Sequence, residues 1–273
     1  MPLRRDLLLR RLWSKNRKFA ASLEAGLIEP SGLPTHVGFV FSYYFRFASL
    51  AVKRGRNRAL RRIRVEGEEH LDAVRRRGRG MIVVSAHIGD FEAAGASLSR
   101  AGITPVVVSR QLMPRWRESV FTGVRRRCGM VVRDRDETRL HDLADDLARG
   151  RAILMMIDRH VPGPVLHSSF LDRRSAIPLA AAVLATRTGA PIVCAATWRA
   201  DQGESIVWYG PPKICQSIED AQEVLSDCAL HLATLIKTWP GQWHVPADLG
   251  QLSWVDREGE REPAVTDLKS TAA

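Results

Sequence analysis

Strands and helices alternate along the body of the chain, to judge from the spacing of its hydrophobic residues. Continuous apolar runs predict buried strands at 81–86, 103–109, 130–132, 152–158 and 191–198. Apolar residues at helical spacing predict helices at 68–78, 91–102, 114–129, 136–150, 175–189 and 217–240. A further strand, at 205–210, is expected at an edge of the sheet. The alternation predicts an α/β fold with helices packed around a largely parallel sheet.

The first 64 residues follow a different pattern. Residues 36–52 hold four of the eight Phe and two of the three Tyr, with Arg46 as their one basic residue, and 53–64 then hold seven basic residues and no acidic one. An aromatic stretch of this length with an internal arginine fits a helix lying in a membrane interface better than one spanning the membrane. The alternatives are a core helix followed by a solvated charged helix, or contact with nucleic acid, for which the chain shows no known module.

Charge and cysteine content refine this picture. The chain of 273 residues carries a net charge of +11, and residues 1–64, with 15 Lys/Arg against 3 Asp/Glu, hold the whole positive excess. This predicts an acidic partner surface, such as anionic lipid, for a basic helical arm at 1–64. The four cysteines lack metal-ligand spacing and are interpreted as reduced thiols, and arginines interrupt any secretory signal near the N-terminus. Residues 65–255 form the predicted main domain, and the polar tail at 256–273 is expected to be disordered.

The candidate chemistry lies in 83-VVSAHIGDFEAAG-95, where a predicted strand passes into a helix. His87 follows the carboxyl end of the strand, the edge at which open α/β sheets bind ligands. Gly89 permits a sharp turn, and Glu92 falls in the first helical turn. The spacing allows Glu92 to fold back onto the imidazole and orient it as a general base. A helix cap or a satisfied core histidine is the structural alternative.

A nucleophile is missing from this arrangement. The chain has no GxSxG elbow, so we interpret the substrate as the source of the hydroxyl that His87 would deprotonate for attack on an acyl carbonyl. Backbone N–H groups at the start of the 90–101 helix are candidates for stabilising the oxyanion. His160 and His167 have no recognisable ligand spacing, so no metal or other cofactor is predicted.

The segment 87-HIGDFE-92 resembles the HxxxxE/D box of the lipid A biosynthesis lauroyl/myristoyl acyltransferase family, a part of the lysophospholipid acyltransferase group. Further segments resemble segments of the family and follow in the same order along the chain: 106-VVVSR-110, 147-LARGRAILMMIDRH-160, 170-FLDRRSAIPLAAAVLATRTGAP-191 and 239-WPGQWH-244. The chain departs from the family where Arg159 replaces a glutamine, and where Leu171 and Asp172 replace a phenylalanine-glycine pair. The resemblance covers about residues 35–245.

The resemblance implies a single αβα acyltransferase domain, peripheral or monotopic at the cytoplasmic face of the bacterial inner membrane. It implies transfer of a fatty acyl chain from acyl carrier protein or acyl-CoA to a hydroxyl of a membrane lipid or glycolipid. His87 would be the base and Glu92 the supporting acid.

Carried over residue by residue, the resemblance makes Arg110 a candidate contact for substrate phosphate, with Asp158 and Arg159 at the end of another strand on the same face. Gly89 and Asp90 shape the turn, and Asp90 is expected to be a helix N-cap. A non-catalytic lipid-binding protein of the same fold and an acyl ester or thioester hydrolase remain as alternatives. No nucleic-acid partner is expected.

Overall fold

The computed structural model describes residues 33–109, 115–159, 162–200 and 203–244, and the predicted tail lies outside them. Their strands are β1 (Ile63–Glu66), β2 (Met81–Ser85), β3 (Pro105–Ser109), β4 (Val131–Asp134), β5 (Ala152–Met156), β6 (Val165–Phe170), β7 (Arg173–Pro178), β8 (Ile192–Arg199) and β9 (Ser205–Tyr209). Their helices are α3 (Leu33–Leu50), α4 (Lys53–Arg61), α5 (Glu68–Arg76), α6 (Phe91–Arg100), α7 (Arg115–Arg127), α8 (Leu140–Ala148), α9 (Ala180–Thr188), α10 (Ile218–Thr238) and the 3₁₀ turn η2 (Pro240–Gln242).

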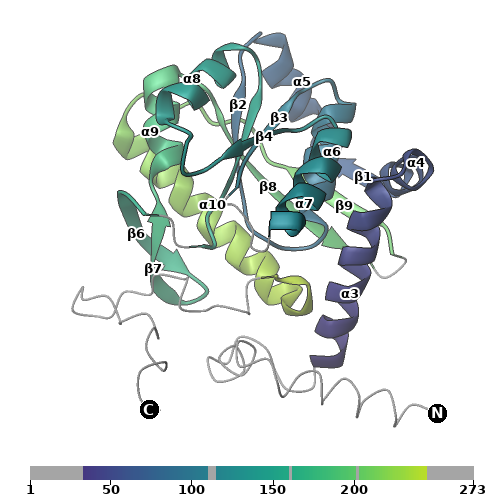
Figure 1. Ribbon diagram of the computed structural model, residues 1–273. Helices are drawn as coiled ribbons and strands as arrows, with labels where there is room; N and C mark the ends of the chain where they lie inside the picture. Colours follow the sequence, from purple (N-terminus) through teal and green to yellow (C-terminus); the bar gives the residue numbers. More distant parts are fainter. Residues whose placement is uncertain (1–32, 110–114, 160–161, 201–202, 245–273) are drawn as a thin grey trace, which may run out of the picture.

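Seven strands form the central sheet in the order β1-β9-β8-β2-β5-β3-β4 (Figure 1). Every neighbouring pair is parallel except β8 with β9. The predicted mostly parallel sheet is therefore confirmed. The prediction that 205–210 lies at an edge is wrong, because β1 pairs with β9 on its outer side. The sequence hides β1, because this short strand follows directly on the run of basic residues in α4.

Both faces of the sheet are covered by helices, as the continuous apolar runs predict. Side chains of β2 alternate between the faces. Ile82 and Val84 pack in one cluster with α8, α9 and α10, whereas Met81 and Val83 pack in another with α5 and α6. All four side chains are buried. The sheet core thus fixes the position of the turn that follows β2.

An antiparallel hairpin of β6 and β7 lies where the helix of 175–189 was expected to begin. That helix, α9, starts only at Ala180. Leu171 and Asp172 form the hairpin turn with positive φ angles of 53° and 61°. Such a turn ordinarily carries Asn or Gly, so the sequence lacks the usual hairpin signal. These are also the two positions at which the family's phenylalanine-glycine pair is absent.

The helix α3 packs against the domain instead of standing apart from it. Phe39, Tyr43, Phe47 and Leu50 follow one another at helical spacing and are buried. Phe47 and Leu50 share a small core cluster with α6 and α7. The following helix α4 buries no residue. None of the helices in the described ranges is both long and apolar enough to cross a membrane.

Candidate active site

The parallel register of β2 and β5 brings His87 and Asp158 together. Ser85 at the end of β2 is paired with Met156 at the end of β5, and His87 and Asp158 lie two residues beyond these partners. The His87 Nδ1 atom lies 2.7 Å from Asp158 Oδ1, and the His87 backbone N–H donates to Oδ2 over 2.8 Å. Two segments remote in sequence thus meet at the carboxyl edge of the sheet, where open α/β folds bind ligands.

Asp158 is fully buried but well supplied with donors. Besides its two bonds from His87, it accepts a hydrogen bond from Trp243 Nε1 over 2.9 Å. Burial alone would raise the pKa of Asp158, but the charge of His87 and these hydrogen bonds outweigh it and lower the pKa to about 2. The carboxylate is therefore ionised at neutral pH and can only accept. His87 Nδ1 is therefore the donor in this hydrogen bond, and in the neutral imidazole the lone pair then lies on Nε2.

Gly89 gives the turn between β2 and α6 its shape. Its φ is +64°, and a Cβ atom there would lie 2.3 Å from the carbonyl oxygen of Thr197. Only glycine combines this conformation with this close approach. The Gly89 N–H donates to the Gln242 carbonyl, and the His244 N–H donates to the His87 carbonyl. The segment 239–244 therefore fixes the turn between β2 and α6 through these two backbone hydrogen bonds.

Glu92 does not fold back onto His87 as its spacing suggested. It sits in the first turn of α6 and is buried, and its carboxylate binds the Arg125 side chain in α7, with Arg125 Nη2 to Glu92 Oε1 at 2.7 Å and Nε to the same oxygen at 3.0 Å. Burial would lower the pKa of Arg125, but Glu92 outweighs it and raises that pKa. The ion pair joins α6 to α7, and the carboxylate beside the imidazole is that of Asp158.

Asp90 stands at the N-cap position of α6 as expected, but its side chain makes no capping bond. Its carboxylate accepts from Arg46 Nη1 at 2.7 Å, from Arg199 Nη2 at 2.7 Å and from Ser205 Oγ at 2.5 Å. Burial would raise the pKa of Asp90, but Arg199 above all lowers it. The arginine that interrupts the aromatic stretch thus faces inward and ties α3 to the turn after His87.

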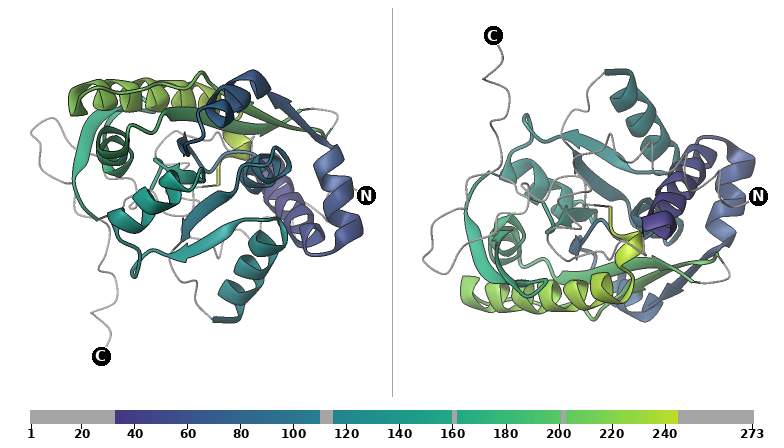
Figure 2. Two further views of the ribbon diagram at one scale, coloured as in Figure 1. Left: turned by 90° about the horizontal axis from the view of Figure 1, so that it is seen from above. Right: turned by 90° about the horizontal axis from the view of Figure 1, so that it is seen from below.

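Aromatic rings of α3 line the same region. Phe91 packs edge-on against His87 with ring centroids 5.1 Å apart, and Tyr43 stacks on Phe91 at 5.3 Å. Tyr43 also meets the His244 ring at 4.3 Å, and η2 lies beside α3 (Figure 2, right). The buried Tyr43 hydroxyl has no hydrogen-bond partner among the described residues, and burial raises its pKa. The helix α3 is therefore one wall of the site.

The remaining predicted residues contribute less to this geometry. Arg110 lies outside the described residues. Arg159 follows Asp158 but is exposed. Sequence reasoning missed Arg199 and gave Trp243 no role. Arg199 is an ordinary arginine near a strand end, and only the resemblance drew attention to the segment that contains Trp243.

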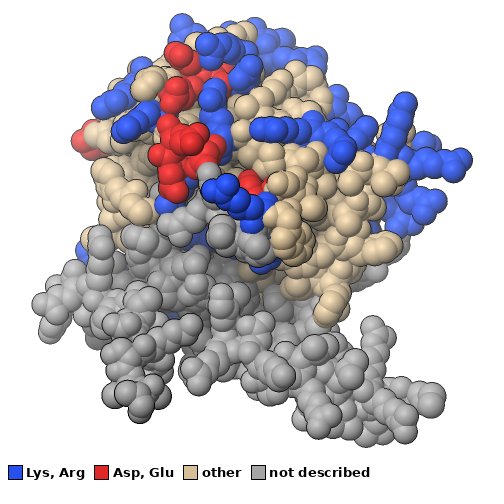
Figure 3. Space-filling view, in the orientation of Figure 1, with Lys and Arg blue, Asp and Glu red and all other residues tan. Residues whose placement is uncertain are grey.

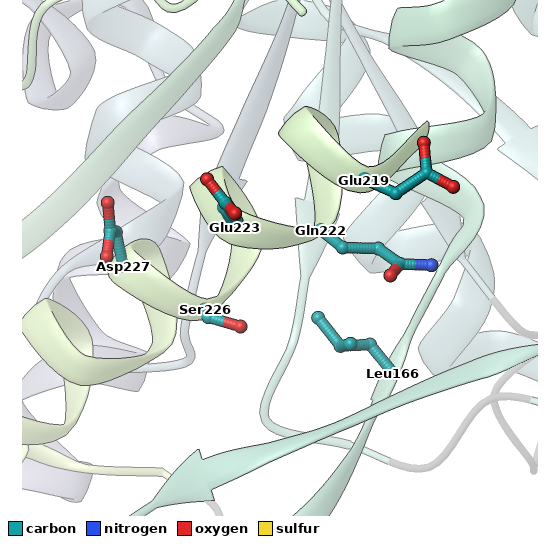
Figure 4. Close-up of a pocket in the computed structure, with 6 residues that line it drawn as sticks. All are labelled: Leu166, Glu219, Gln222, Glu223, Ser226 and Asp227. Carbon is teal, nitrogen blue, oxygen red and sulfur yellow. The ribbon is translucent and has the colours of Figure 1, made fainter. Parts of the chain in front are cut away.

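A separate hollow of about 450 Å³ lies between α10 and β6 (Figure 4). Its lining side chains are Leu166, Glu219, Gln222, Glu223, Ser226 and Asp227. Three of these are carboxylates, and the residues that hold His87 are not among them. Nothing at this hollow adds to the chemistry of the site.

The comparison with known families decides the chain's affiliation. The profile of the bacterial lipid A biosynthesis acyltransferase family matches residues 38–245. The chain belongs to this family. The resemblance carried by the HxxxxE/D box is thus confirmed over most of the sequence.

Individual relatives are more distant. A phosphatidylinositol mannoside acyltransferase of Mycobacterium tuberculosis is 26% identical over 194 residues, which cover 69% of this chain and 61% of the relative. Its namesake in Mycolicibacterium smegmatis is 25% identical over 180 residues, 65% of this chain and 59% of the relative. The chain thus spans about three fifths of the length of these curated relatives. The solved structure of a 1-acyl-sn-glycerophosphate acyltransferase, PlsC, from Thermotoga maritima is 15% identical, with a TM-score of 0.41 over 89% of this chain and all of that one.

Proposed function

We propose that the protein is an O-acyltransferase that moves a fatty acyl chain from a thioester to a hydroxyl group of a membrane glycolipid. The observation that supports this most is the hydrogen bond between His87 Nδ1 and the buried, ionised carboxylate of Asp158. With Nδ1 donating to Asp158, the neutral imidazole presents its Nε2 lone pair, as a general base requires.

The proposed reaction is a direct transfer. His87 Nε2 takes the proton of the acceptor hydroxyl, and the acceptor oxygen attacks the thioester carbonyl carbon. The C–S bond then breaks, and the proton passes from His87 to the departing thiolate. Asp158 keeps the imidazole oriented and stabilises its positive charge between the two proton transfers.

The oxyanion of the intermediate needs hydrogen-bond donors. The amides of His87, Ile88 and Gly89 are already engaged, by Asp158, Ala86 and Gln242. The proposal therefore assigns the oxyanion to the first amides of α6, where the helix dipole adds to the stabilisation. Glu92 takes the role of fixing α6 against α7 through Arg125.

The acceptor is inferred from the names of the similar proteins, and the donor from the chemistry of acyl transfer. The relatives named above act, by their names, on a mannoside of phosphatidylinositol, which favours a glycosylated phospholipid over a lysophospholipid or a lipid A precursor as acceptor. The donor is acyl carrier protein or acyl-CoA, both of which present the acyl chain as a thioester. The rings of Phe91 and Tyr43 beside His87 are apolar surface of the kind that suits such a chain, since each buried methylene contributes about 0.8 kcal/mol.

We also propose that the protein lies on the cytoplasmic face of the inner membrane and is not inserted across it. In support, the exposed helix α4 borders a hollow of about 760 Å³ whose lining is Arg54, Gly55, Arg58, Arg61 and Arg62. Four guanidinium groups around one hollow favour anionic headgroups, at roughly 1 kcal/mol for each basic residue near such a surface.

A comparison of cellular lipids tests the proposed activity. Mass spectrometry of lipids from a deletion strain that expresses either the wild-type protein or His87→Ala should show one glycolipid class gaining an acyl chain with the wild-type protein alone. Equal lipid profiles in the two strains would contradict the proposal. Release of free fatty acid in place of an acylated lipid would make the protein a hydrolase.

A further inference from the structure

Two helices, not one, present apolar side chains on the same side of the protein. On α3, Phe41, Tyr44 and Phe45 are 64%, 46% and 78% exposed. On α7, Trp116 and Val120 are 66% and 51% exposed. Both sets repeat at three or four residues, so each lies along one face of its helix. Soluble domains rarely leave this many large apolar side chains in water without a use for them.

The two apolar faces adjoin each other. The Tyr44 ring meets the Phe121 ring edge-on at 6.4 Å, and Phe47 stacks on Phe121 at 4.6 Å. Phe121 belongs to α7, one residue after Val120. In the space-filling view an uncharged area extends over α3, with Lys and Arg gathered beside it at α4 (Figure 3). The α3–α7 face is therefore one apolar surface with a basic rim.

We propose that the α3–α7 face is the lipid-docking surface of the protein, and that α7 is a second membrane contact within the catalytic domain. Its occupant is a bilayer that contains anionic lipid. Exposed Trp, Tyr and Phe are the side chains favoured at the level of the headgroups. Arg115 and Arg117 flank Trp116 and are exposed, so α7 itself carries the positive charge that an anionic surface attracts. This inference rests on the proposed action on a membrane lipid.

Docking through both helices also orients the catalytic site. The inner side of α3 carries Tyr43, which touches Phe91 beside His87. Arg125 on α7 holds Glu92 in the first turn of α6. Each docking helix is thus one contact away from the start of α6. A lipid docked at the α3–α7 face would therefore lie close to the start of α6 and to His87.

A vesicle assay with matched variants tests the inference. Val120→Ser removes an apolar side chain of α7, and Leu230→Ser removes one of equal exposure, 51%, from α10. The full-length protein is mixed with vesicles of equal parts phosphatidylglycerol and phosphatidylcholine, and bound protein is separated by flotation. We expect the partition coefficient to fall about tenfold for Val120→Ser, and further when Trp116→Ser is added. Leu230→Ser should stay within about twofold of wild type.

A fluorescent probe gives a readout that does not depend on removing a contact. Ser119→Cys, one turn from Trp116 on α7, and Thr234→Cys, one turn from Leu230 on α10, are each labelled with an environment-sensitive dye. Vesicles should shift the emission of the dye at 119 to the blue and leave the dye at 234 unchanged. Equal responses at the two positions, or unchanged partition of the α7 variants, would overturn the inference.

Two further arms separate this inference from other accounts. Transfer to an acceptor dispersed in detergent should survive in Val120→Ser, because the site itself is untouched. If Val120→Ser no longer partitions onto vesicles but still acylates the dispersed acceptor, the docking surface is supported. If the wild-type protein does not acylate the dispersed acceptor, the proposed function alone is refuted. If Val120→Ser instead abolishes self-association in sedimentation velocity and leaves partition unchanged, the face joins copies of the chain and the inference fails.

Discussion

Replacement of each of the two carboxylates near the site by its amide should have a different effect: Asp158→Asn should mainly lower the rate, and Glu92→Gln should mainly lower the stability. Asp158→Asn keeps the shape of a fully buried side chain that accepts from His87 Nδ1, the His87 amide and Trp243. The amide has one acceptor oxygen, and it is needed at the position of Oδ2, which accepts from both the His87 amide and Trp243 Nε1. The NH₂ group then faces His87 Nδ1 and favours the other tautomer of the imidazole. General-base catalysis contributes about 10²–10⁴-fold, and we expect Asp158→Asn to lose a rate factor in that range.

Glu92→Gln serves as the comparison. It leaves Arg125, whose side chain is 12% exposed, without its charged partner. Breaking a buried ion pair on one side costs about 3–5 kcal/mol of stability, so this variant should be less stable than Asp158→Asn. Its rate of transfer per folded molecule should fall by less than about tenfold, because Glu92 does not touch the imidazole.

The assay measures initial rates of acyl transfer to dispersed glycolipid, with each rate divided by the folded fraction from circular dichroism. Urea unfolding of the same samples gives the free energy of unfolding. The assignment of Asp158 as the orienting carboxylate is wrong if Asp158→Asn retains the wild-type rate. It is equally wrong if Glu92→Gln loses as much rate per folded molecule as Asp158→Asn does.

Three further predictions concern stability and binding. The pKa of Asp158 is about 2 in the folded protein, below its usual 3.8. The carboxylate therefore contributes about 2 kcal/mol of stability above about pH 4, and this contribution is lost as the pH falls through about 2. Urea unfolding across this range should show a steeper loss of stability in the wild type than in Asp158→Asn. Gly89→Ala should destabilise the fold by more than the roughly 1–2 kcal/mol expected of left-handed strain alone. Gly102→Ala is the matched control for strain without a clash, because φ is +80° there and nothing lies within 4 Å of an added Cβ. Equal shifts of the melting temperature in the two variants would contradict the close approach of Gly89 to Thr197. Replacing Arg54, Arg58 and Arg61 by Gln should weaken binding to anionic vesicles by about 100-fold and leave the melting temperature unchanged, and binding that persists would exclude α4 as a headgroup contact.

Much of the fold could be read from local patterns. Continuous apolar runs located β2, β3, β5 and β8, and the periodic segments located the helices between them. The exceptions have physical causes. β1 adjoins a basic helix, and the β6–β7 turn uses Leu171 and Asp172 at positive φ where turn-forming residues are usual. The expectation of an edge position for β9 fails for the same reason, because its outer neighbour is β1.

The site was predictable in part. The position of His87 beyond a strand end followed from the sequence, but its partner depends on strand register. Asp158 stands two residues past β5 as His87 does past β2, and only the pairing of β2 with β5 makes them neighbours. Sequence spacing favoured Glu92 because it counts residues along the chain and not across the sheet. The inward direction of Arg46 likewise depends on Asp90, 44 residues away.

The role of His87 is the central claim, and one rate measurement tests it most directly. Purified His87→Gln is compared with wild type for transfer of a radiolabelled acyl chain from an acyl thioester to dispersed glycolipid, with circular dichroism as the control for folding. The proposed mechanism predicts a folded variant whose rate falls by about 10²–10⁴-fold or more. A folded variant that transfers the acyl chain at the wild-type rate would contradict it.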